Sequence, residues 1–241
     1  MGWPAGQIGS INGVSDMSTG QNFIRITFVT LLISSLVVSV CQQGVAAGAL
    51  PAKAEDITPV KAGDRAPAFT VRTVNDEPYH FDPDGLERPT ILITFRGGWC
   101  PYCNMHLSEL RHVIPGLKDG GFDVLFLSND RPELLYESLK KETQESIDGL
   151  DYKILSDADL NAARALGTAF TVSDRLIQRR NEKGDDIEES SIDKYKALAV
   201  PAVVLVDLSG EISFFYANPD YKVRLSADEL QRAAEELLAD K

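Results

Sequence analysis

Cysteine, histidine and basic side chains are all scarce in this sequence. Its 241 residues include three cysteines and three histidines, and 24 Lys and Arg against 36 Asp and Glu give a net charge of −12. Nucleic-acid binding needs clustered Lys and Arg, so the excess of acid argues against a nucleic-acid partner. With 44% hydrophobic residues, the chain can still bury a sizeable core. Its length suits one domain and a leader rather than two full domains.

Charge is nearly absent from residues 1–54, which hold one acid, Asp16, and two bases, Arg25 and Lys53. An uncharged apolar run covers residues 26–41 directly after Arg25, and small residues follow it. This layout is typical of a secretory signal. We therefore predict that the protein is exported to the periplasm or to another extracytoplasmic compartment.

Three positions in the leader fit the small-x-small rule of signal peptidase, and cleavage at the last would leave a domain over residues 55–241. Two alternatives stay open. The apolar run approaches the ~17–25 residues that span a bilayer, so it could remain as an uncleaved anchor that holds the protein at a membrane. A lipid anchor on Cys41 is the other, although Val40 precedes it where a small residue is expected. The first sixteen residues are long and charge-poor for a signal, which favours Met17 as the true start. The three positions that fit the signal-peptidase rule are Val45-Ala46-Ala47, Ala47-Gly48-Ala49 and Ala52-Lys53-Ala54.

Two of the three cysteines, Cys100 and Cys103, stand in one short motif, Trp-Cys-Pro-Tyr-Cys. The residues before it, 89–95, form a β-branched and aromatic run that is typical of a buried strand. After it, Leu and Ile recur at helical spacing over residues 107–117. The pair therefore lies where a strand gives way to a helix, with Pro101 in the first turn, where its missing N–H costs nothing.

A thiolate at a helix N-terminus is favoured by unpaired N–H groups and by the helix dipole. We therefore expect Cys100 to be the more exposed thiol, to have the lower pKa and to act as the nucleophile. Cys103, one turn deeper, would resolve a mixed disulfide on Cys100. A structural pair and half of a zinc site are the alternatives, but Trp99 and the strand–helix setting favour reactive thiols. A bond that closes only two residues adds little stability, so redox exchange explains the pair better.

Strands and helices are predicted to alternate through the rest of the domain. A short edge strand at residues 69–71 comes first, and strands at 122–128 and 152–155 follow the motif. Helices at 132–145 and 157–166 lie after these two strands. Such alternation implies parallel strands joined by crossover helices.

Residues 172–197 break this alternation because they are rich in charged and polar side chains and have no sustained apolar period. We predict an exposed, partly helical insertion near the entrance of the site; a plain solvated loop and a partner-recognition surface are both open. Beyond it we expect a strand at 199–207, a hairpin turn at 208–210, a strand at 211–217 and a helix from Ala227, capped by Ser226.

This arrangement resembles the thioredoxin fold, an α/β fold with a central mixed sheet flanked by helices. The resemblance implies that Val200-Pro201 is a cis peptide packed against the cysteines. More narrowly, about residues 62–240 resemble the peroxiredoxin-like branch of the alkyl hydroperoxide reductase and thiol-specific antioxidant family. The matching residues are Gly63-Asp64-x-Ala66-Pro67-x-Phe69, Arg96-Gly97-Gly98-Trp99-Cys100-Pro101-Tyr102-Cys103, Val200-Pro201-Ala202 and Asp220-Tyr221-x-x-Arg224.

The chain departs from the family pattern at positions that matter for peroxide. Typical members have a Thr three residues before the attacking Cys and a Pro four before that, where this chain has Gly97 and Ile93. They also carry an Arg at the position where this chain has Val200-Pro201. Arg96 and Arg224 are candidates to replace these groups by lowering the Cys100 pKa and donating hydrogen bonds. For each of them, the sequence alone favours a surface or ion-pair role over this one.

The motif and the resemblance predict a thiol-dependent oxidoreductase with antioxidant activity, in which Cys100 and Cys103 cycle between dithiol and disulfide. The Trp-Cys-x-x-Cys motif and Pro201 favour disulfides as substrates, whereas the wider family favours peroxides. A reducing thiol partner, thioredoxin-like or glutathione-type, must restore the dithiol. We expect no cofactor.

An exported copper-binding or copper-delivery protein on the same fold is the alternative function. Such proteins typically use a Cys-x-x-x-Cys and a distant His, and the spacing here is one residue shorter. His106 and His112 follow the cysteines on the same predicted helix, but a complete tetrahedral set would need a fourth ligand. We therefore assign no metal ligand to the redox site.

Overall fold

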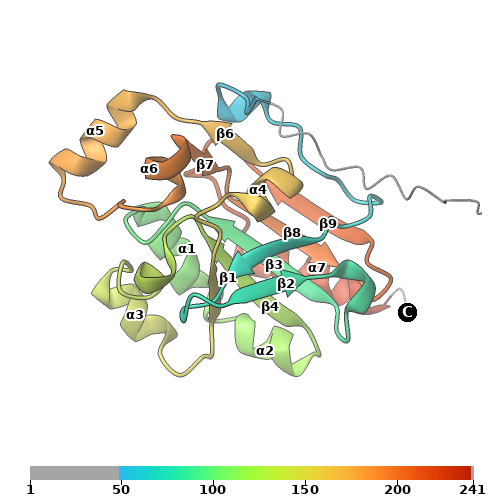
Figure 1. The fold of residues 1–241 in the computed structure, drawn as a ribbon. Helices are drawn as coiled ribbons and strands as arrows, with labels where there is room; N and C mark the ends of the chain where they lie inside the picture. The colour runs from blue at the N-terminus through green and yellow to red at the C-terminus, as the bar shows by residue number, and fades with distance from the viewer. Residues whose placement is uncertain (1–48, 240–241) are drawn as a thin grey trace, which may run out of the picture. The chain divides into compact units, whose positions relative to one another are not determined.

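A seven-stranded mixed sheet forms the centre of the fold in the computed structural model, which describes residues 49–239 (Figure 1). The strand order is β2-β1-β5-β4-β3-β8-β9. The strands are β1 (Phe69–Arg72), β2 (Pro78–Phe81), β3 (Thr90–Phe95), β4 (Asp123–Ser128), β5 (Lys153–Ser156), β8 (Ala202–Val206) and β9 (Ile212–Ala217).

Strands β3, β4 and β5 run parallel, and helices connect them as the alternation predicts. These are α1 (Pro101–Leu110), α2 (Ile114–Asp119) and α3 (Lys141–Ile147). The remaining pairings in the sheet are antiparallel. The prediction that residues 69–71 form an edge strand is wrong, because β1 pairs with β5 at Arg72 and Ser156 and β2 takes the edge.

Alternate residues of the strands β3, β4, β5 and β8 feed two separate cores, one on each face of the sheet. In β3, Ile91, Ile93 and Phe95 face the core that α1, α2, α3 and α7 (Ala227–Ala239) cover, and Leu92 faces the other. The second core is covered by α4 (Asn161–Ala165). Because successive side chains of a strand point to opposite faces, an uninterrupted apolar run such as β3 is what a strand covered on both sides requires.

Side chains accept hydrogen bonds from N–H groups at the starts of two helices, and the cap at Ser226 was predicted. The Ser226 hydroxyl accepts a hydrogen bond from the Glu229 N–H at 3.3 Å, and the Glu229 carboxylate accepts one from the Ser226 N–H at 3.0 Å, which is a capping box. The Asp157 carboxylate accepts from the N–H groups of Ala162 and Ala163, both at 2.9 Å, at the start of α4.

The helix predicted over residues 132–145 is divided into a short 3-10 turn at Pro132–Leu134 and α3. The break has a local cause, because the Lys140 N–H donates to the Asn104 side chain at 2.8 Å instead of to a carbonyl one turn earlier. The segment is thus fixed against α1, which carries the cysteines.

Residues 172–197 form two helices, α5 (Asp174–Glu182) and α6 (Ser191–Tyr195), on a small separate sheet. That sheet is the antiparallel pair β6 (Ala169–Thr171) and β7 (Ala197–Ala199). The strand predicted over 199–207 is therefore divided at Val200-Pro201 between β7 and β8. Ile187, Ile192 and Leu198 are buried in a cluster of their own beneath the two helices.

Residues 55–61 pack on the domain. The Val60 N–H donates to the Leu166 carbonyl at 3.1 Å, and the 3-10 turn η1 (Ala54–Asp56) precedes it. Just upstream, the Pro51 carbonyl accepts hydrogen bonds from the N–H and the hydroxyl of Thr171, at 2.8 and 3.2 Å. The predicted leader, including residues 26–41, otherwise lies outside the described residues. Within residues 49–239 no helix is both long and apolar enough to cross a membrane.

Candidate active site

The two cysteines lie at the junction of β3 and α1, as predicted. Cys100 is the N-cap residue of α1 and Pro101 is its first residue. The N–H groups of Cys103 and Asn104 both donate to the Cys100 carbonyl at 3.1 Å. Cys103 is thus placed one turn into the helix.

Both thiols are free and buried. Cys100 is 1% exposed and Cys103 is 0% exposed, so Cys100 is the more exposed of the two, as predicted, but only by a small margin. Trp99, Tyr102 and Tyr221 pack against the core cluster that contains the sulfurs. The rings of Tyr102 and Tyr221 meet edge to face with centroids 5.6 Å apart.

The two thiols have pKa values that are shifted in opposite directions. The hydrogen bond from the Cys103 side chain is the main cause that lowers the pKa of Cys100 to about 6. The Cys103 N–H and the charges of Arg96 and Arg224 act in the same sense, while burial opposes them. Burial, and then the interaction with Cys100, raise the pKa of Cys103 well above its usual value. The helix start therefore separates a thiolate from a thiol, as expected.

Arg96 and Arg224 converge on this pair. Arg224 donates from Nη2 to the Cys103 Sγ at 3.4 Å. Arg96 is 7% exposed, and its guanidinium lies 4.4 Å from the Tyr221 ring centroid and 5.5 Å from that of Trp99. Within the described part of the chain neither arginine forms an ion pair, and both retain buried N–H groups without a partner. They are charges directed at the thiols rather than surface or ion-pair residues.

The turn before Cys100 needs both of its glycines. Gly97 has φ +131, and a Cβ there would strike the Asp130 carboxylate and come within 2.7 Å of the Trp99 Nε1. A Cβ on Gly98 would run into the backbone of Ser138. The space that a Thr would need at Gly97 is thus occupied, which explains this departure from the family pattern.

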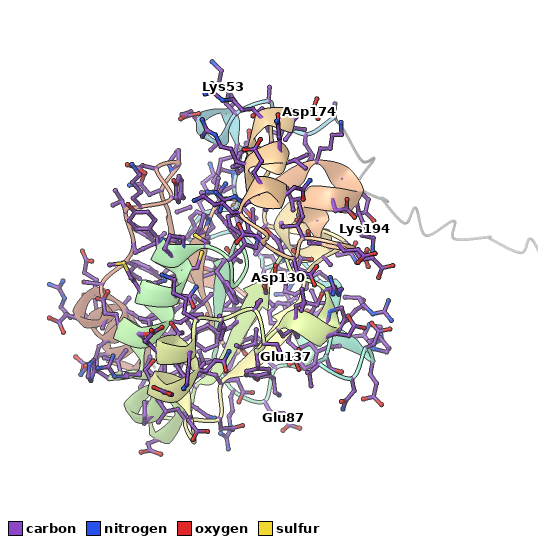
Figure 2. All side chains as sticks on the ribbon, turned by 90° about the vertical axis from the view of Figure 1, so that its left-hand side faces the viewer. Lys53, Glu87, Asp130, Glu137, Asp174 and Lys194 are labelled. Carbon is purple, nitrogen blue, oxygen red and sulfur yellow. The ribbon has the colours of Figure 1, made fainter. Side chains whose placement is uncertain are left out.

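Asp130 belongs to the site although no sequence motif pointed to it. Its Oδ2 accepts from the Gly98 N–H at 2.7 Å and from the Ser138 hydroxyl at 3.0 Å, while its Oδ1 has no partner among the described residues. Figure 2 shows Asp130 inside the molecule, and burial raises its pKa to about 6. A signal was available: Asp130 follows β4, and the carboxyl ends of the parallel strands β3 and β4 meet at one edge of the sheet.

The insertion also reaches the site. Arg180 of α5 lies 5.0 Å from the centroid of the Trp99 ring, on which Arg96 also lies, and forms an ion pair with Asp185 at 3.2 Å. Trp99 packs on the buried cluster around Ile192 as well. One arginine in a polar segment carries no sequence signal, so this contact was not predicted.

The segment Val200-Pro201 is tied to β3 through Thr94. The Thr94 hydroxyl donates to the Val200 carbonyl at 3.3 Å and accepts from the Ala202 N–H at 2.8 Å. Pro201 lines one cavity with Arg96 and a smaller one with Arg224. The cis form of the peptide stays a prediction.

His106 is used in a structural contact. Its Nε2 lies 3.0 Å from the Leu225 carbonyl, and burial, with a contribution from Arg224, lowers its pKa to about 4. Among residues 49–239 no group of three or more His, Cys, Asp or Glu side chains is arranged to hold a metal ion.

Comparison with known proteins places this site in a family. The model of the family described as Redoxin matches residues 61–230. Peroxiredoxin Bcp of Escherichia coli (strain K12) is 30% identical over 111 residues, which cover 46% of this chain and 67% of that protein. The chain belongs to the redoxin family. Within it, the chain is a peroxiredoxin-like member of the alkyl hydroperoxide reductase and thiol-specific antioxidant group, as the motifs predicted.

Solved structures confirm the thioredoxin-like fold of this redoxin. Peroxidoxin BcpB from Mycobacterium tuberculosis matches with a TM-score of 0.52 at 15% identity, covering 76% of this chain and 99% of that one. A peroxiredoxin-like protein from Aquifex aeolicus matches with a TM-score of 0.53 at 20% identity, covering 75% and 89%. A yeast mitochondrial 1-Cys peroxiredoxin matches with a TM-score of 0.56 at 16% identity, covering 75% and 77%. Family membership identifies the chain as a thiol-dependent peroxidase or oxidoreductase.

Proposed function

We propose that this redoxin is a peroxidase in which Cys100 attacks a hydroperoxide and Cys103 resolves the product as a disulfide. The observation that carries the proposal is a low-pKa thiol that is 1% exposed. Burial of this degree admits a small hydroperoxide more readily than the disulfide of a folded protein. Arg96 and Arg224 supply the positive charge and hydrogen-bond donors that the family's usual Arg and Thr do not supply here.

In the first step the Cys100 thiolate attacks the terminal oxygen of ROOH. A sulfur–oxygen bond forms, the oxygen–oxygen bond breaks, and the alkoxide takes a proton from solvent to leave as ROH. Arg96, whose charge acts on Cys100, stabilises the negative charge that moves to the leaving oxygen. Cys100 is left as a sulfenic acid.

In the second step the Cys103 sulfur attacks the Cys100 sulfenic acid. A disulfide forms, and hydroxide leaves and takes the Cys103 proton as water. The two thiols have then given two electrons to the peroxide. The contact between the sulfurs in the reduced state means that the step needs only a small change in the first turn of α1.

Exchange with protein disulfides is the competing activity, and two assays separate it from peroxide reduction. Purified protein is given dithiothreitol and either hydrogen peroxide or insulin, and the loss of peroxide and the precipitation of reduced insulin are followed. We expect peroxide loss that Cys100→Ser abolishes, with insulin reduction near the uncatalysed rate. Efficient insulin reduction without peroxide loss would overturn the proposal.

We further propose that the protein works outside the cytoplasm, on the strength of the charge-poor leader with its apolar run. Localisation of the full-length chain by cell fractionation tests this, with a chain lacking residues 1–48 as the matched control. Equal recovery of both chains in the cytoplasm would contradict it.

A further inference from the structure

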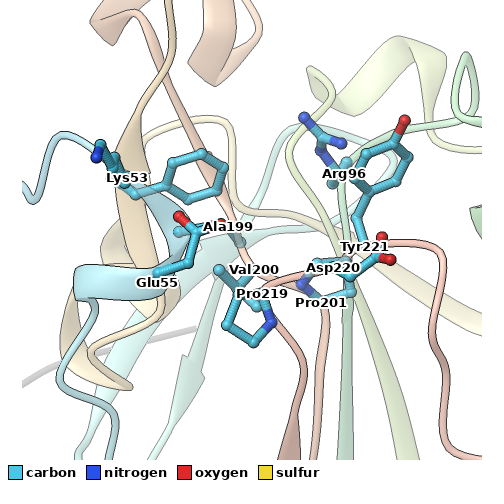
Figure 3. Close-up of a pocket in the computed structure, with 11 residues that line it drawn as sticks. Lys53, Glu55, Arg96, Ala199, Val200, Pro201, Pro219, Asp220 and Tyr221 are labelled. Carbon is cyan, nitrogen blue, oxygen red and sulfur yellow. The ribbon is translucent and has the colours of Figure 1, made fainter.

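A cavity of about 450 Å³ lies beside Arg96, and its walls come from segments far apart in the chain (Figure 3). One wall is the turn η1, which contacts β6, and the opposite wall is Arg96 with Asp220 and Tyr221 from the loop after β9. Phe170 of β6 also lines the cavity. Val200, Pro201 and Pro219 lie between the walls. This volume falls in the range of small-molecule sites and is too small for a folded partner.

The charges in the cavity are balanced and sorted. Each wall carries one cation and one carboxylate: Lys53 and Glu55 on one side, Arg96 and Asp220 on the other. Figure 3 shows the two cationic groups toward one end of the gap and the two carboxylates nearer the other. Within residues 49–239 none of these four side chains forms an ion pair with another residue. A cavity with cations toward one end and carboxylates nearer the other is complementary to a ligand that carries one negative and one positive group.

We propose that this cavity binds a zwitterionic small thiol, an amino acid or short peptide with a free carboxylate and a free ammonium group, which reduces the Cys100–Cys103 disulfide. The carboxylate lies toward Arg96 and Lys53, and the ammonium group toward Asp220 and Glu55. This inference deepens the peroxidase proposal and rests on it for the origin of the disulfide.

Arg96 links the cavity to the sulfurs. It lines the cavity, and its charge acts on both Cys100 and Cys103. Pro201 lies in the wall between the cavity and the smaller space beside Arg224, which donates to Cys103. A ligand whose carboxylate pairs with Arg96 is therefore held beside the residue whose charge acts on both sulfurs, and the proposal requires its thiol to reach Cys100 from this side.

The reduction uses two thiols in two exchanges. The bound thiolate attacks the Cys100 sulfur, and Cys103 leaves as a thiolate that takes up a proton. A second thiolate then attacks the ligand's sulfur in the mixed disulfide, and Cys100 leaves as the thiolate that its environment stabilises. The products are the protein dithiol and the small disulfide, so the two electrons that restore the enzyme come from the two thiols.

Four small thiols that differ mainly in charge test the proposal. They are cysteine (zwitterion), cysteamine (cation), 3-mercaptopropionate (anion) and 2-mercaptoethanol (neutral). Full-length protein oxidised with diamide is mixed with each thiol, and the protein dithiol is counted by mass after acid quenching and alkylation. Each rate is divided by the rate of the same thiol with 5,5′-dithiobis(2-nitrobenzoate), which cancels most of the differences in thiolate fraction and nucleophilicity.

We expect the corrected rate for cysteine to exceed the rates for cysteamine and 3-mercaptopropionate by about tenfold, as two moderately exposed charge pairs would give, and to exceed the rate for 2-mercaptoethanol by more. Asp220→Asn should remove most of the advantage of cysteine over 3-mercaptopropionate, and Lys53→Gln should reduce its advantage over cysteamine. Asp119→Asn, at the exposed end of α2 and outside the cavity, is the matched control and should change neither ratio.

Corrected rates that are equal for cysteine, cysteamine and 3-mercaptopropionate would overturn the inference, as would ratios that the cavity variants leave unchanged. Because diamide makes the disulfide without peroxide, either result leaves the peroxidase proposal standing. Absence of peroxide consumption would sink that proposal separately.

Discussion

Two sulfurs of the same residue type, in contact with each other, are given different chemistry by their surroundings. Cys100 at the helix start receives hydrogen bonds and two positive charges, whereas Cys103 is enclosed one turn further on. The motif alone predicted which thiol would ionise. It could not predict that both would be buried, because the ring of Tyr221 comes from a distant segment that only the fold brings to the motif.

The Cys100 pKa is the first test at this scale. Thiolate absorbance near 240 nm should titrate with a midpoint of about 6. Because the unfolded thiol has a pKa of ~8.5, this ionisation stabilises the reduced fold above that pH, and the contribution is lost as the pH falls through about 6.

Arg96→Met should move the midpoint upward, since it removes one of the positive charges. Arg65→Met, an exposed arginine that is not among the groups acting on Cys100, is the control; a midpoint near 8.5 in the unmutated protein would contradict the account.

Gly97→Thr restores the residue found in typical family members, and we expect it to harm this protein. The new side chain would meet Asp130 and Trp99 at a backbone φ of +131, so stability should fall by roughly 1–3 kcal/mol. Urea unfolding of the reduced protein measures the loss. Gly116→Thr, at a helical position whose Cβ meets nothing within 4 Å, serves as the comparison. A Gly97→Thr protein as stable as its parent and more active with peroxide would show that the space is available.

At the scale of elements, the insertion is more ordered than its polar sequence suggested. Its apolar residues are few, but Ile192 is 0% exposed and packs in the cluster that also receives Trp99. The absence of an apolar period predicted an exposed segment correctly for α5, which has no buried residue. It missed the cluster beneath, since Ile187, Ile192 and Leu198 do not follow one helical period.

Ile192→Ala tests whether the insertion supports the site. Removal of this buried side chain should cost about 2–5 kcal/mol if the insertion unfolds with the domain, and it should change the fluorescence of Trp99. Val74→Ala, at a side chain that is 48% exposed, provides the comparison. If stability falls but Trp99 fluorescence and peroxide kinetics do not change, the insertion stabilises the fold without shaping the site.

The strands of the sheet and their order could be predicted from the sequence only in part. Apolar runs located β3, β4 and β8, and the alternation predicted the parallel centre of the sheet. Placement of β1 was wrong because the pairing of Arg72 with Ser156 depends on contacts between segments more than eighty residues apart. The break in the helix at Lys140 was equally invisible, since it depends on Asn104 of another helix.

At the scale of the whole molecule, the domain begins earlier than the composition suggested. Leu50 packs against a buried cluster that includes Ala169 and Ala199, and the Pro51 carbonyl accepts two hydrogen bonds from Thr171. The turn η1 then forms one wall of the cavity. We therefore propose that a leader, where one is removed, is cut before Leu50 rather than after Ala54.

Truncation tests that boundary. A chain that begins at Leu50 should be more stable than one that begins at Ile57 by about 1–3 kcal/mol, because the shorter chain loses the Pro51 hydrogen bonds and the Leu50 contacts. Thermal unfolding of the two proteins gives the difference. N-terminal sequencing of exported protein would contradict the proposal if the first residue were Glu55.

The account depends most on the assignment of attack to Cys100 and resolution to Cys103. One measurement tests it directly: the mass of reduced protein after one equivalent of hydrogen peroxide, with dimedone present to trap sulfenic acid. Parent protein should lose two hydrogens and gain no adduct, Cys103→Ser should carry one dimedone on Cys100, and Cys100→Ser should stay unmodified. A dimedone adduct on Cys103, or oxidation of Cys100→Ser at the parent rate, would contradict the assignment.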